Sequence, residues 1–288
     1  MKRVWIVALV SLLVLAAFAV WNPGFVLNAA SWGGDVVAER DIPFGKDARL
    51  KLDVYRPAKV DGASPVVVFF YGGSWQHGDK SIYRFVGAAL ARAGIVVVIP
   101  DYRLYPPAIY PDFLQDSALA VRWAKDNAAR FGGDALTLFL AGHSAGAYNA
   151  ISLATDRRWL AEVGLDPKAD LSGAIGIAGP YDFLPLKDEQ LKIIFGPEAE
   201  RPKTQPIHYV NGDEPPLLLL RPAHDTVVDP GNSERLAMRV EQKNGKAILK
   251  TYNRVGHLSI LGTISPLLSF LAPTRSDLVA FIRENSVR

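Results

Sequence analysis

The stretch LAGHSAGAYN, residues Leu140–Asn149, places one serine between two glycines as Gly142-His143-Ser144-Ala145-Gly146. The apolar run before it, residues 136–142, predicts a strand buried on both faces. The residues after it, 145–155, have the spacing of a helix. A serine on so sharp a strand-to-helix turn needs a glycine two positions to either side, because neighbouring side chains would otherwise collide. We therefore predict that Ser144 is a nucleophile presented on a tight turn.

The same alternation of strands and helices extends along the chain. Apolar, β-branched runs predict further buried strands at residues 65–73, 95–103, 173–179, 215–222 and 246–253. Amphipathic runs predict further helices at residues 84–94, 113–133 and 276–286. Residues 50–57 alternate apolar and polar positions, which favours an antiparallel or edge strand. The predicted fold class is α/β, with a mostly parallel central sheet and helices on both faces.

One segment interrupts this alternation. Residues 184–212 carry mixed charges and several prolines, at Pro185, Pro197, Pro202 and Pro206. Prolines at this density break helices and strands. We expect a small cap-like excursion over the sheet rather than a second domain.

The first residues differ from the rest of the chain. Lys2 and Arg3 precede an uncharged apolar run from Val4 to Trp21, which is typical of a signal peptide or an uncleaved membrane anchor. We divide the chain into residues 1–21 as this targeting segment, 22–34 as a linker and 35–288 as the α/β domain. The protein is then expected to be exported, either to the periplasm or anchored through residues 4–21 and facing outside.

The composition excludes several classes of protein. The 288-residue chain has a net charge of +3 and shows no basic stripe, so no nucleic acid is expected as a partner. It contains no cysteine, which excludes disulfides, thiolate catalysis and zinc sites built from cysteine. The oligomeric state is left open by the sequence.

A serine becomes an effective nucleophile only beside a base. On a strand–serine–helix turn of this kind, an acid and then a histidine follow the serine along the chain. His208, His224 and His257 all follow Ser144. His257 lies in a loop just past the last predicted strand, so we predict that it is the base.

The acid is expected after the strand that precedes this last one. Asp225 and Asp229 both lie there, in LLLLRPAHDTVVDP. Asp225 is nearer to the end of the strand, and the apolar residues 227–228 would anchor its loop, so we favour Asp225. A carboxylate at this point would orient the imidazole of His257 and stabilise its protonated form.

Backbone donors for a developing oxyanion are expected in FFYGGSWQHGDK, residues 69–80. Gly72 and Gly73 can bring their N–H groups close to a substrate oxygen because no Cβ blocks the approach. The N–H of Ala145, directly after the serine, is a further expected donor. Trp75 and Tyr71 are predicted to contact the substrate.

In their order and spacing, these motifs resemble the α/β-hydrolase superfamily, and within it carboxylesterases of the hormone-sensitive-lipase and feruloyl-esterase-like (BD-FAE-like) type. The resemblance runs from about residue 50 to the C-terminus and includes IPDYRLYP, HDTVV and the final Gly-His pair, residues 256–257. It implies a triad and an oxyanion hole formed by Ser144, Asp225, His257, Gly72, Gly73 and Ala145. The family usually has His-Gly-Gly where this chain has Tyr71-Gly72-Gly73. That tyrosine could shape the loop through its hydroxyl, and it leaves the substrate preference open.

The function expected from the resemblance is hydrolysis of small-molecule carboxylic esters with a short to medium acyl chain, through an acyl-enzyme. No metal or organic cofactor is implied. The stretch GGSWQHGDKSIYRFV also looks like bacterial kynurenine formamidases, so amide hydrolysis is an alternative, as is deacetylation of a carbohydrate. A non-catalytic binding module on the same fold is a further alternative, although such modules usually lose the serine or the histidine.

A last unusual segment, Leu258–Leu271, contains no charged residue. Exposed apolar area on this scale is unfavourable in water, so the segment needs a partner. It is either a core helix broken by Pro266, one wall of an acyl pocket, or a surface that rests on a membrane.

Overall fold

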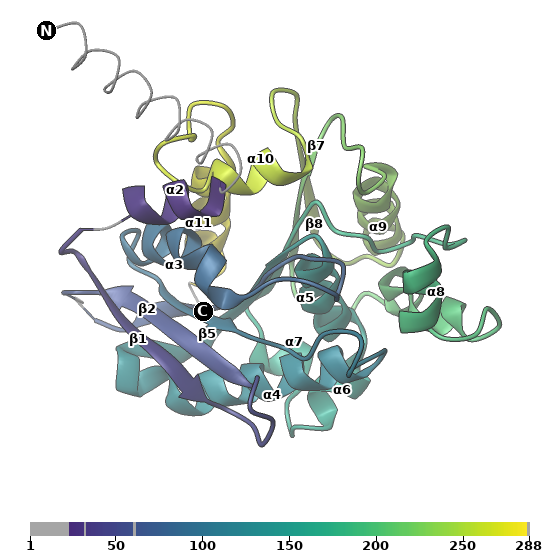
Figure 1. Cartoon of the computed structure of the whole chain (residues 1–288), viewed down its shortest axis with the longest axis horizontal. Helices are drawn as coiled ribbons and strands as arrows, with labels where there is room; N and C mark the ends of the chain where they lie inside the picture. The colour runs from purple at the N-terminus through teal and green to yellow at the C-terminus, as the bar shows by residue number, and fades with distance from the viewer. Residues whose placement is uncertain (1–22, 32, 60–61, 287–288) are drawn as a thin grey trace, which may run out of the picture.

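The computed structural model describes residues 23–31, 33–59 and 62–286. A single eight-stranded sheet lies at the centre of the fold (Figure 1). The strands are β1 (Val36–Pro43), β2 (Lys51–Pro57), β3 (Ser64–Phe70), β4 (Val96–Pro100), β5 (Gly133–His143), β6 (Gly173–Ile177), β7 (Leu217–Pro222) and β8 (Ala247–Tyr252). Their spatial order is β1-β2-β4-β3-β5-β6-β7-β8. From β4 to β8 all neighbouring strands pair in parallel, which confirms the predicted mostly parallel sheet.

The antiparallel part of the sheet lies at one end. β2 pairs antiparallel with β1 on one side and with β4 on the other. The antiparallel direction predicted for residues 50–57 is therefore confirmed. The edge position belongs instead to β1, a strand that the sequence did not predict because its exposed and half-buried residues show no simple alternation.

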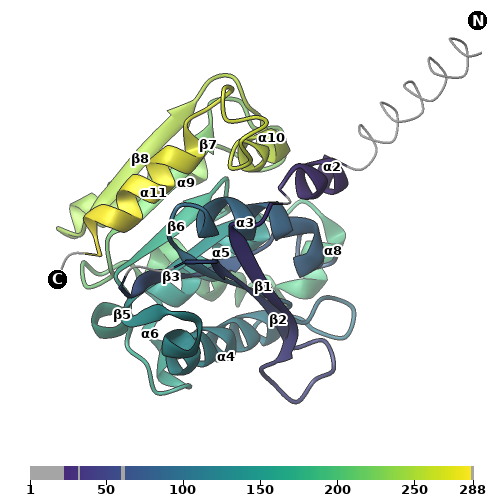
Figure 2. The same cartoon turned by 90° about the vertical axis from the view of Figure 1, so that its left-hand side faces the viewer.

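Helices cover both faces of the sheet, as predicted (Figure 2). On one face lie α3 (Arg84–Ala91) and α11 (Thr274–Glu284), and α4 (Asp112–Asn127) lies on the other, where it packs against α5 (Ala145–Thr155). The remaining helices of eight or more residues are α2 (Pro23–Ala30) and α9 (Gly231–Gln242). Shorter helices are α6 (Arg157–Ala161), α7 (Pro167–Asp170), α8 (Glu189–Ile194) and α10 (His257–Gly262).

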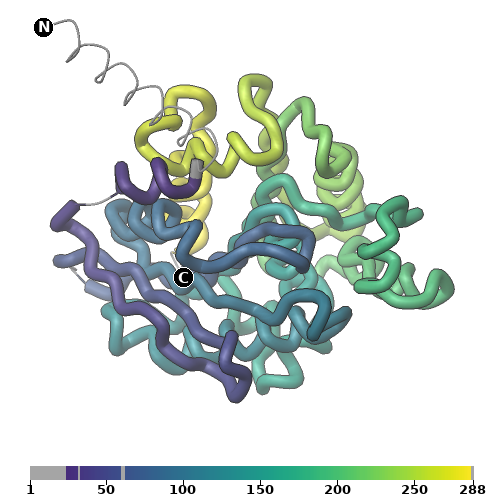
Figure 3. The backbone as a smooth tube through the Cα atoms, viewed as in Figure 1, coloured from purple at the N-terminus to yellow at the C-terminus, as the bar shows by residue number. Residues whose placement is uncertain are grey.

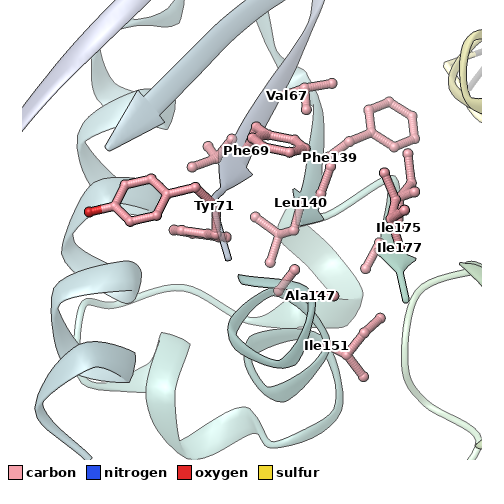
Figure 4. Close-up of a cluster of buried hydrophobic side chains, with 14 of the residues drawn as sticks. Val67, Phe69, Tyr71, Phe139, Leu140, Ala147, Ile151, Ile175 and Ile177 are labelled. Carbon is pink, nitrogen blue, oxygen red and sulfur yellow. The ribbon is translucent and has the colours of Figure 1, made fainter. Parts of the chain in front are cut away.

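A cluster of buried side chains fills the space where the central strands meet α5 (Figure 4). Leu140 on β5 and Ile175 on β6 are fully buried beneath Ala147 and Ile151 of α5. Burial of an aliphatic side chain of this size contributes about 1.5–3 kcal/mol. The serine turn between β5 and α5 therefore rests on fully buried core residues.

Two predictions about connecting segments have different outcomes. Residues 22–34 were predicted to be a linker, but residues 23–30 form α2, whose Asn28 donates to the carbonyl of Ser81 and accepts from the N–H of Phe85. These hydrogen bonds, together with the burial of Leu27 in the core, hold this short helix. The excursion at residues 184–212 leaves the sheet after β6 and returns before β7, and it contains α8 and short 3₁₀ turns (Figure 3).

The predicted targeting segment, residues 1–21, lies outside the described residues. Within the residues that are described, no helix is both long enough and apolar enough to cross a membrane.

Candidate active site

Ser144 lies at the sharp turn between β5 and α5. Its backbone has φ 55° and ψ −123°, a conformation that residues with side chains rarely adopt. A Cβ on Gly142 would lie 2.1 Å from the carbonyl oxygen of Gly146, and a Cβ on Gly146 would lie 2.1 Å from that of Phe70. Both obstructing atoms belong to the backbone, so only glycine fits at these two positions.

His257 begins α10, and its ring lies between Ser144 and Asp225. The ring Nε2 is 2.9 Å from Ser144 Oγ, and Nδ1 is 2.8 Å from Asp225 Oδ2. The other carboxylate oxygen of Asp225 accepts hydrogen bonds from the backbone N–H groups of Val227 and Val228, at 2.8 and 3.0 Å. The three predicted side chains thus form one hydrogen-bonded row, with Asp225 held from both sides.

The other candidates for the acid and the base lie outside this hydrogen-bonded row. Asp229 is on the same loop, but its carboxylate pairs with Arg235 at 3.2 Å and accepts from the N–H of Gly231 at 3.0 Å. These two donors, the Gly231 N–H foremost, keep the pKa of Asp229 below its ordinary value. His208 and His224 are both exposed, so neither shares the buried row with Ser144.

His143 is buried behind His257. Its Nε2 lies 2.8 Å from the backbone carbonyl oxygen of His257, so this nitrogen carries the proton and donates it. Its Nδ1 has no hydrogen-bond partner among the described residues. Burial, together with repulsion from a protonated His257, lowers the pKa of His143 to about 3. The neutral His143 ring therefore supports the backbone from which the His257 ring projects.

The loop after β3 passes directly against the serine. A Cβ on Gly72 would lie 2.9 Å from the Cβ of Ser144 and 2.9 Å from the carbonyl oxygen of His143. Gly73 follows with φ 135°, a region that favours glycine. Ala145 is the first residue of α5, where backbone N–H groups have no carbonyl partner within their helix. The predicted donor residues therefore lie around Ser144, with one N–H at a helix N-terminus.

Tyr71 was predicted to contact the substrate. A cavity lies beside Ser144, and Tyr71 is not among the residues that line it. Its side chain is fully buried, and its hydroxyl points away from the core of Figure 4. The hydroxyl donates to Asp101 at 2.8 Å and accepts from Arg49 at 3.0 Å. Its ring stacks between those of Tyr83 and Tyr102. The contacts of Tyr71 are thus with the loop and its supports.

Arg49 and Asp101 extend this support to the far end of the loop. Arg49 also donates to the carbonyl oxygen of Gly78 at 2.8 Å, and Asp101 accepts from the N–H of Lys80 at 3.0 Å. Burial raises the pKa of Asp101, although its hydrogen bonds act in the opposite direction. Neither residue was singled out from the sequence. The one available signal was a carboxylate at the end of a buried strand, in IPDYR.

A cavity of about 490 Å³ opens beside Ser144. Trp75 lines it, as predicted. Its apolar wall includes Phe183, Leu186 and Leu191, in and just before the cap-like excursion, together with residues 227–228 of the Asp225 loop. The segment Leu258–Leu271 does not line it. A cavity of this size and character is typical of sites for small molecules.

Trp75 is held by a polar contact that the sequence analysis did not identify. Its indole N–H donates to the side-chain oxygen of Asn149 at 3.0 Å, and Asn149 in turn donates to Ser117 at 3.2 Å. Its ring packs edge-on against the ring of Phe195, with 4.8 Å between the two ring centroids. The signal was present in the opening stretch, because Asn149 carries an amide side chain in a helix made mostly of small and apolar residues. This contact fixes the indole as one wall of the cavity.

A mostly parallel sheet covered on both faces, with a strained serine after its central strand and a later histidine beside that serine, defines the α/β-hydrolase class. Within this class, residues 52–240 match the BD-FAE family, and the chain belongs to that family.

Individual relatives agree with this placement. Isoprenylcysteine alpha-carbonyl methylesterase of Arabidopsis thaliana is 37% identical over 140 residues, which cover 48% of this chain and 33% of the relative. Esterase LipC of Mycobacterium tuberculosis is 30% identical over 248 residues, which cover 78% of this chain and 59% of the relative. The chain thus spans about a third to three fifths of the length of these curated relatives.

Among solved structures, esterase B of Lactobacillus rhamnosis has a TM-score of 0.77 at 21% identity, over 96% of each chain. At this level of identity the likeness establishes the fold, and it confirms the predicted α/β-hydrolase architecture.

Proposed function

We propose that this protein hydrolyses carboxylic esters through an acyl-enzyme. Ser144 Oγ attacks the ester carbonyl carbon while His257 Nε2 takes the hydroxyl proton. Asp225 holds the imidazole in the required tautomer and stabilises its charge. The N–H groups of the loop after β3 and of Ala145 stabilise the negative oxygen of the tetrahedral intermediate.

The intermediate collapses by breaking the bond to the alkoxy group, and His257 gives its proton to the departing alcohol. A water molecule, deprotonated by the same nitrogen, then attacks the acyl carbonyl and releases the carboxylic acid. The observation that carries this proposal is the buried row of hydrogen bonds at 2.9 and 2.8 Å that joins Ser144 to His257 and His257 to Asp225. The names of the relatives, esterases in both cases, support the same reaction class.

A covalent label tests the proposal. An activated alkyl phosphonate should abolish hydrolysis of p-nitrophenyl butyrate and leave one adduct on the peptide that contains Ser144, found by mass spectrometry. The matched control is Ser144→Ala, which should take no adduct. Rapid hydrolysis by the control variant would contradict the proposal, as would an adduct at another serine.

We further propose that the protein is exported, because Lys2 and Arg3 precede the uncharged run from Val4 to Trp21. Cell fractionation followed by N-terminal sequencing tests this. Membrane or periplasmic protein beginning at Met1 or near Val20 is expected. Cytosolic protein that keeps Met1 and needs no detergent for extraction would contradict it.

A further inference from the structure

Several large apolar side chains at one end of the molecule are exposed. The exposed fractions are 61% for Phe25, 46% for Ile82, 73% for Leu258, 50% for Leu267 and 69% for Phe270. Scattered exposed apolar residues are normal, but a group of this size on one surface marks a contact. We call these five residues the apolar end.

Three separate segments form the apolar end, and their contacts place them side by side. A Cβ on Gly24 of α2 would lie 2.9 Å from Ile82, and a Cβ on Gly262 of α10 would lie 3.8 Å from Leu27 of α2. Figures 1 and 2 both show α2 beside α10 and the turns that follow it. The surface is thus assembled by the fold from residues more than two hundred positions apart.

Two of the three segments are uncharged, and all of them rest on packed residues. Residues 255–274, which contain three of its members, include no lysine, arginine, aspartate or glutamate, and neither does α2. Beneath them Ile260 and Ile264 are fully buried and Leu27 is nearly so. The exposed side chains therefore stand on packed residues, and the surface does not depend on folding of a loose segment.

The sequence that precedes α2 indicates what covers the apolar end. α2 begins at Pro23, and one residue, Asn22, separates it from the uncharged run Val4–Trp21, whose length is at the lower limit for a bilayer span. A span that ends at residue 21 would bring α2, and with it the apolar end, to the lipid headgroups. Aromatic and aliphatic side chains at that depth gain from burial among acyl chains.

We propose that the apolar end lies in the interfacial layer of a lipid bilayer. The folded domain then contacts the membrane at a second place besides the N-terminal run, which fixes its orientation. α10, which begins with His257, lies on the membrane side, so the active site has a defined position relative to the lipid surface. This inference does not depend on the reaction proposed for Ser144.

Single-cysteine labelling of the full chain tests this, because the protein has no cysteine of its own. Phe270→Cys and Leu258→Cys are each labelled with a polarity-sensitive fluorophore. The matched control is Leu136→Cys, at a side chain 63% exposed near the amino end of β5. Each protein is reconstituted in vesicles of phosphatidylcholine and phosphatidylglycerol, and circular dichroism checks that each variant is folded.

Labels at residues 258 and 270 should show blue-shifted emission, quenching by doxyl-labelled lipid and loss of quenching by aqueous iodide. The label at residue 136 should show no blue shift and no quenching by doxyl-labelled lipid, and aqueous iodide should quench it. Equal iodide quenching at all three positions would overturn the proposal. Protection from iodide without lipid quenching, increasing with protein density, would also overturn it and would identify a second copy of the chain as the occupant. Recovery of the full chain free of vesicles after flotation would overturn it as well.

Discussion

Asp225 and Asp229 differ in their hydrogen-bond and ion-pair partners, although they are only four positions apart in one loop. Asp225 accepts two backbone N–H groups with one oxygen and faces His257 with the other. Asp229 is 65% exposed in its side chain and pairs with Arg235. A buried carboxylate beside an imidazole can stabilise the imidazolium, whereas an exposed carboxylate that is already paired cannot.

This difference gives the first prediction. Ser144→Ala and His257→Ala should each lower kcat by about 10⁶-fold, and Asp225→Asn by about 10⁴-fold. Asp229→Asn is the matched control and should change kcat little. Steady-state hydrolysis of p-nitrophenyl butyrate measures all four. If Asp229→Asn proved more damaging than Asp225→Asn, the acid would be misassigned.

His143 gives a second prediction, on stability. Its pKa in the folded protein is about 3, below the ordinary 6.5, so the unfolded chain binds more protons between these two values. The contribution of His143 to the free energy of unfolding should therefore be complete above about pH 6.5. It should fall as the pH drops toward 3, by up to about 1.4 kcal/mol per pH unit.

His143→Gln removes this titration and keeps a donor for the carbonyl of His257. Urea unfolding across this pH range should show a shallower decline for the variant than for the natural protein. Groups that do not interact with His143 titrate equally in both proteins and cancel in the comparison. Parallel curves would mean that His143 is not held neutral by the fold.

At the scale of elements, the loop between β3 and the 3₁₀ turn at Lys80–Tyr83 carries backbone strain at two successive residues. Ser74 and Trp75 both have positive φ, at 54° and 59°, which costs about 1–3 kcal/mol for each residue. Such a loop persists only if its surroundings hold it. The buried hydroxyl of Tyr71, between Asp101 and Arg49, is the main polar support.

Tyr71→Phe should therefore lower kcat by about tenfold with little change in KM, and destabilise the fold by about 1–3 kcal/mol, because Asp101 loses a buried donor. Tyr83→Phe is the matched control, since its hydroxyl makes only a long bond of 3.4 Å to Gly72. Kinetics and thermal unfolding of both variants provide the measurement. A change confined to KM would instead indicate that Tyr71 contacts the substrate.

At the scale of the whole molecule, the cap-like excursion and the loops that follow the strands together define the cavity. Each methylene that an acyl chain buries there contributes about 0.8 kcal/mol until the chain reaches the wall. Across p-nitrophenyl esters from acetate to dodecanoate, kcat/KM should rise to a short or medium chain and then fall.

Leu191→Trp should move this maximum to shorter chains, because Leu191 lines the cavity. Leu136→Trp, far from the cavity on β5, should leave the profile unchanged. A profile that falls steadily from acetate would contradict the apolar-pocket interpretation and favour a deacetylase or a formamidase.

Much of the fold and the reactive serine could be predicted because the deciding interactions are local. Buried parallel strands appear as continuous apolar runs, and the strain at Ser144 is relieved by glycines two positions away. Helix α2 was missed for the opposite reason, because it is held by contacts with distant segments, such as the bonds of Asn28 to residues 81 and 85. Strand β1 was missed because its exposed and half-buried residues show no simple alternation.

By itself, the sequence determined that a strand, a tight turn and a helix present Ser144, because backbone sterics over five residues decide this. Only the tertiary structure decided which aspartate meets His257, 32 positions away, and which apolar segment lines the cavity. Residues 184–191 and 258–271 are both rich in apolar side chains, yet only the first faces the serine. Hydrophobicity requires that a segment be covered, but the path of the chain determines what covers it.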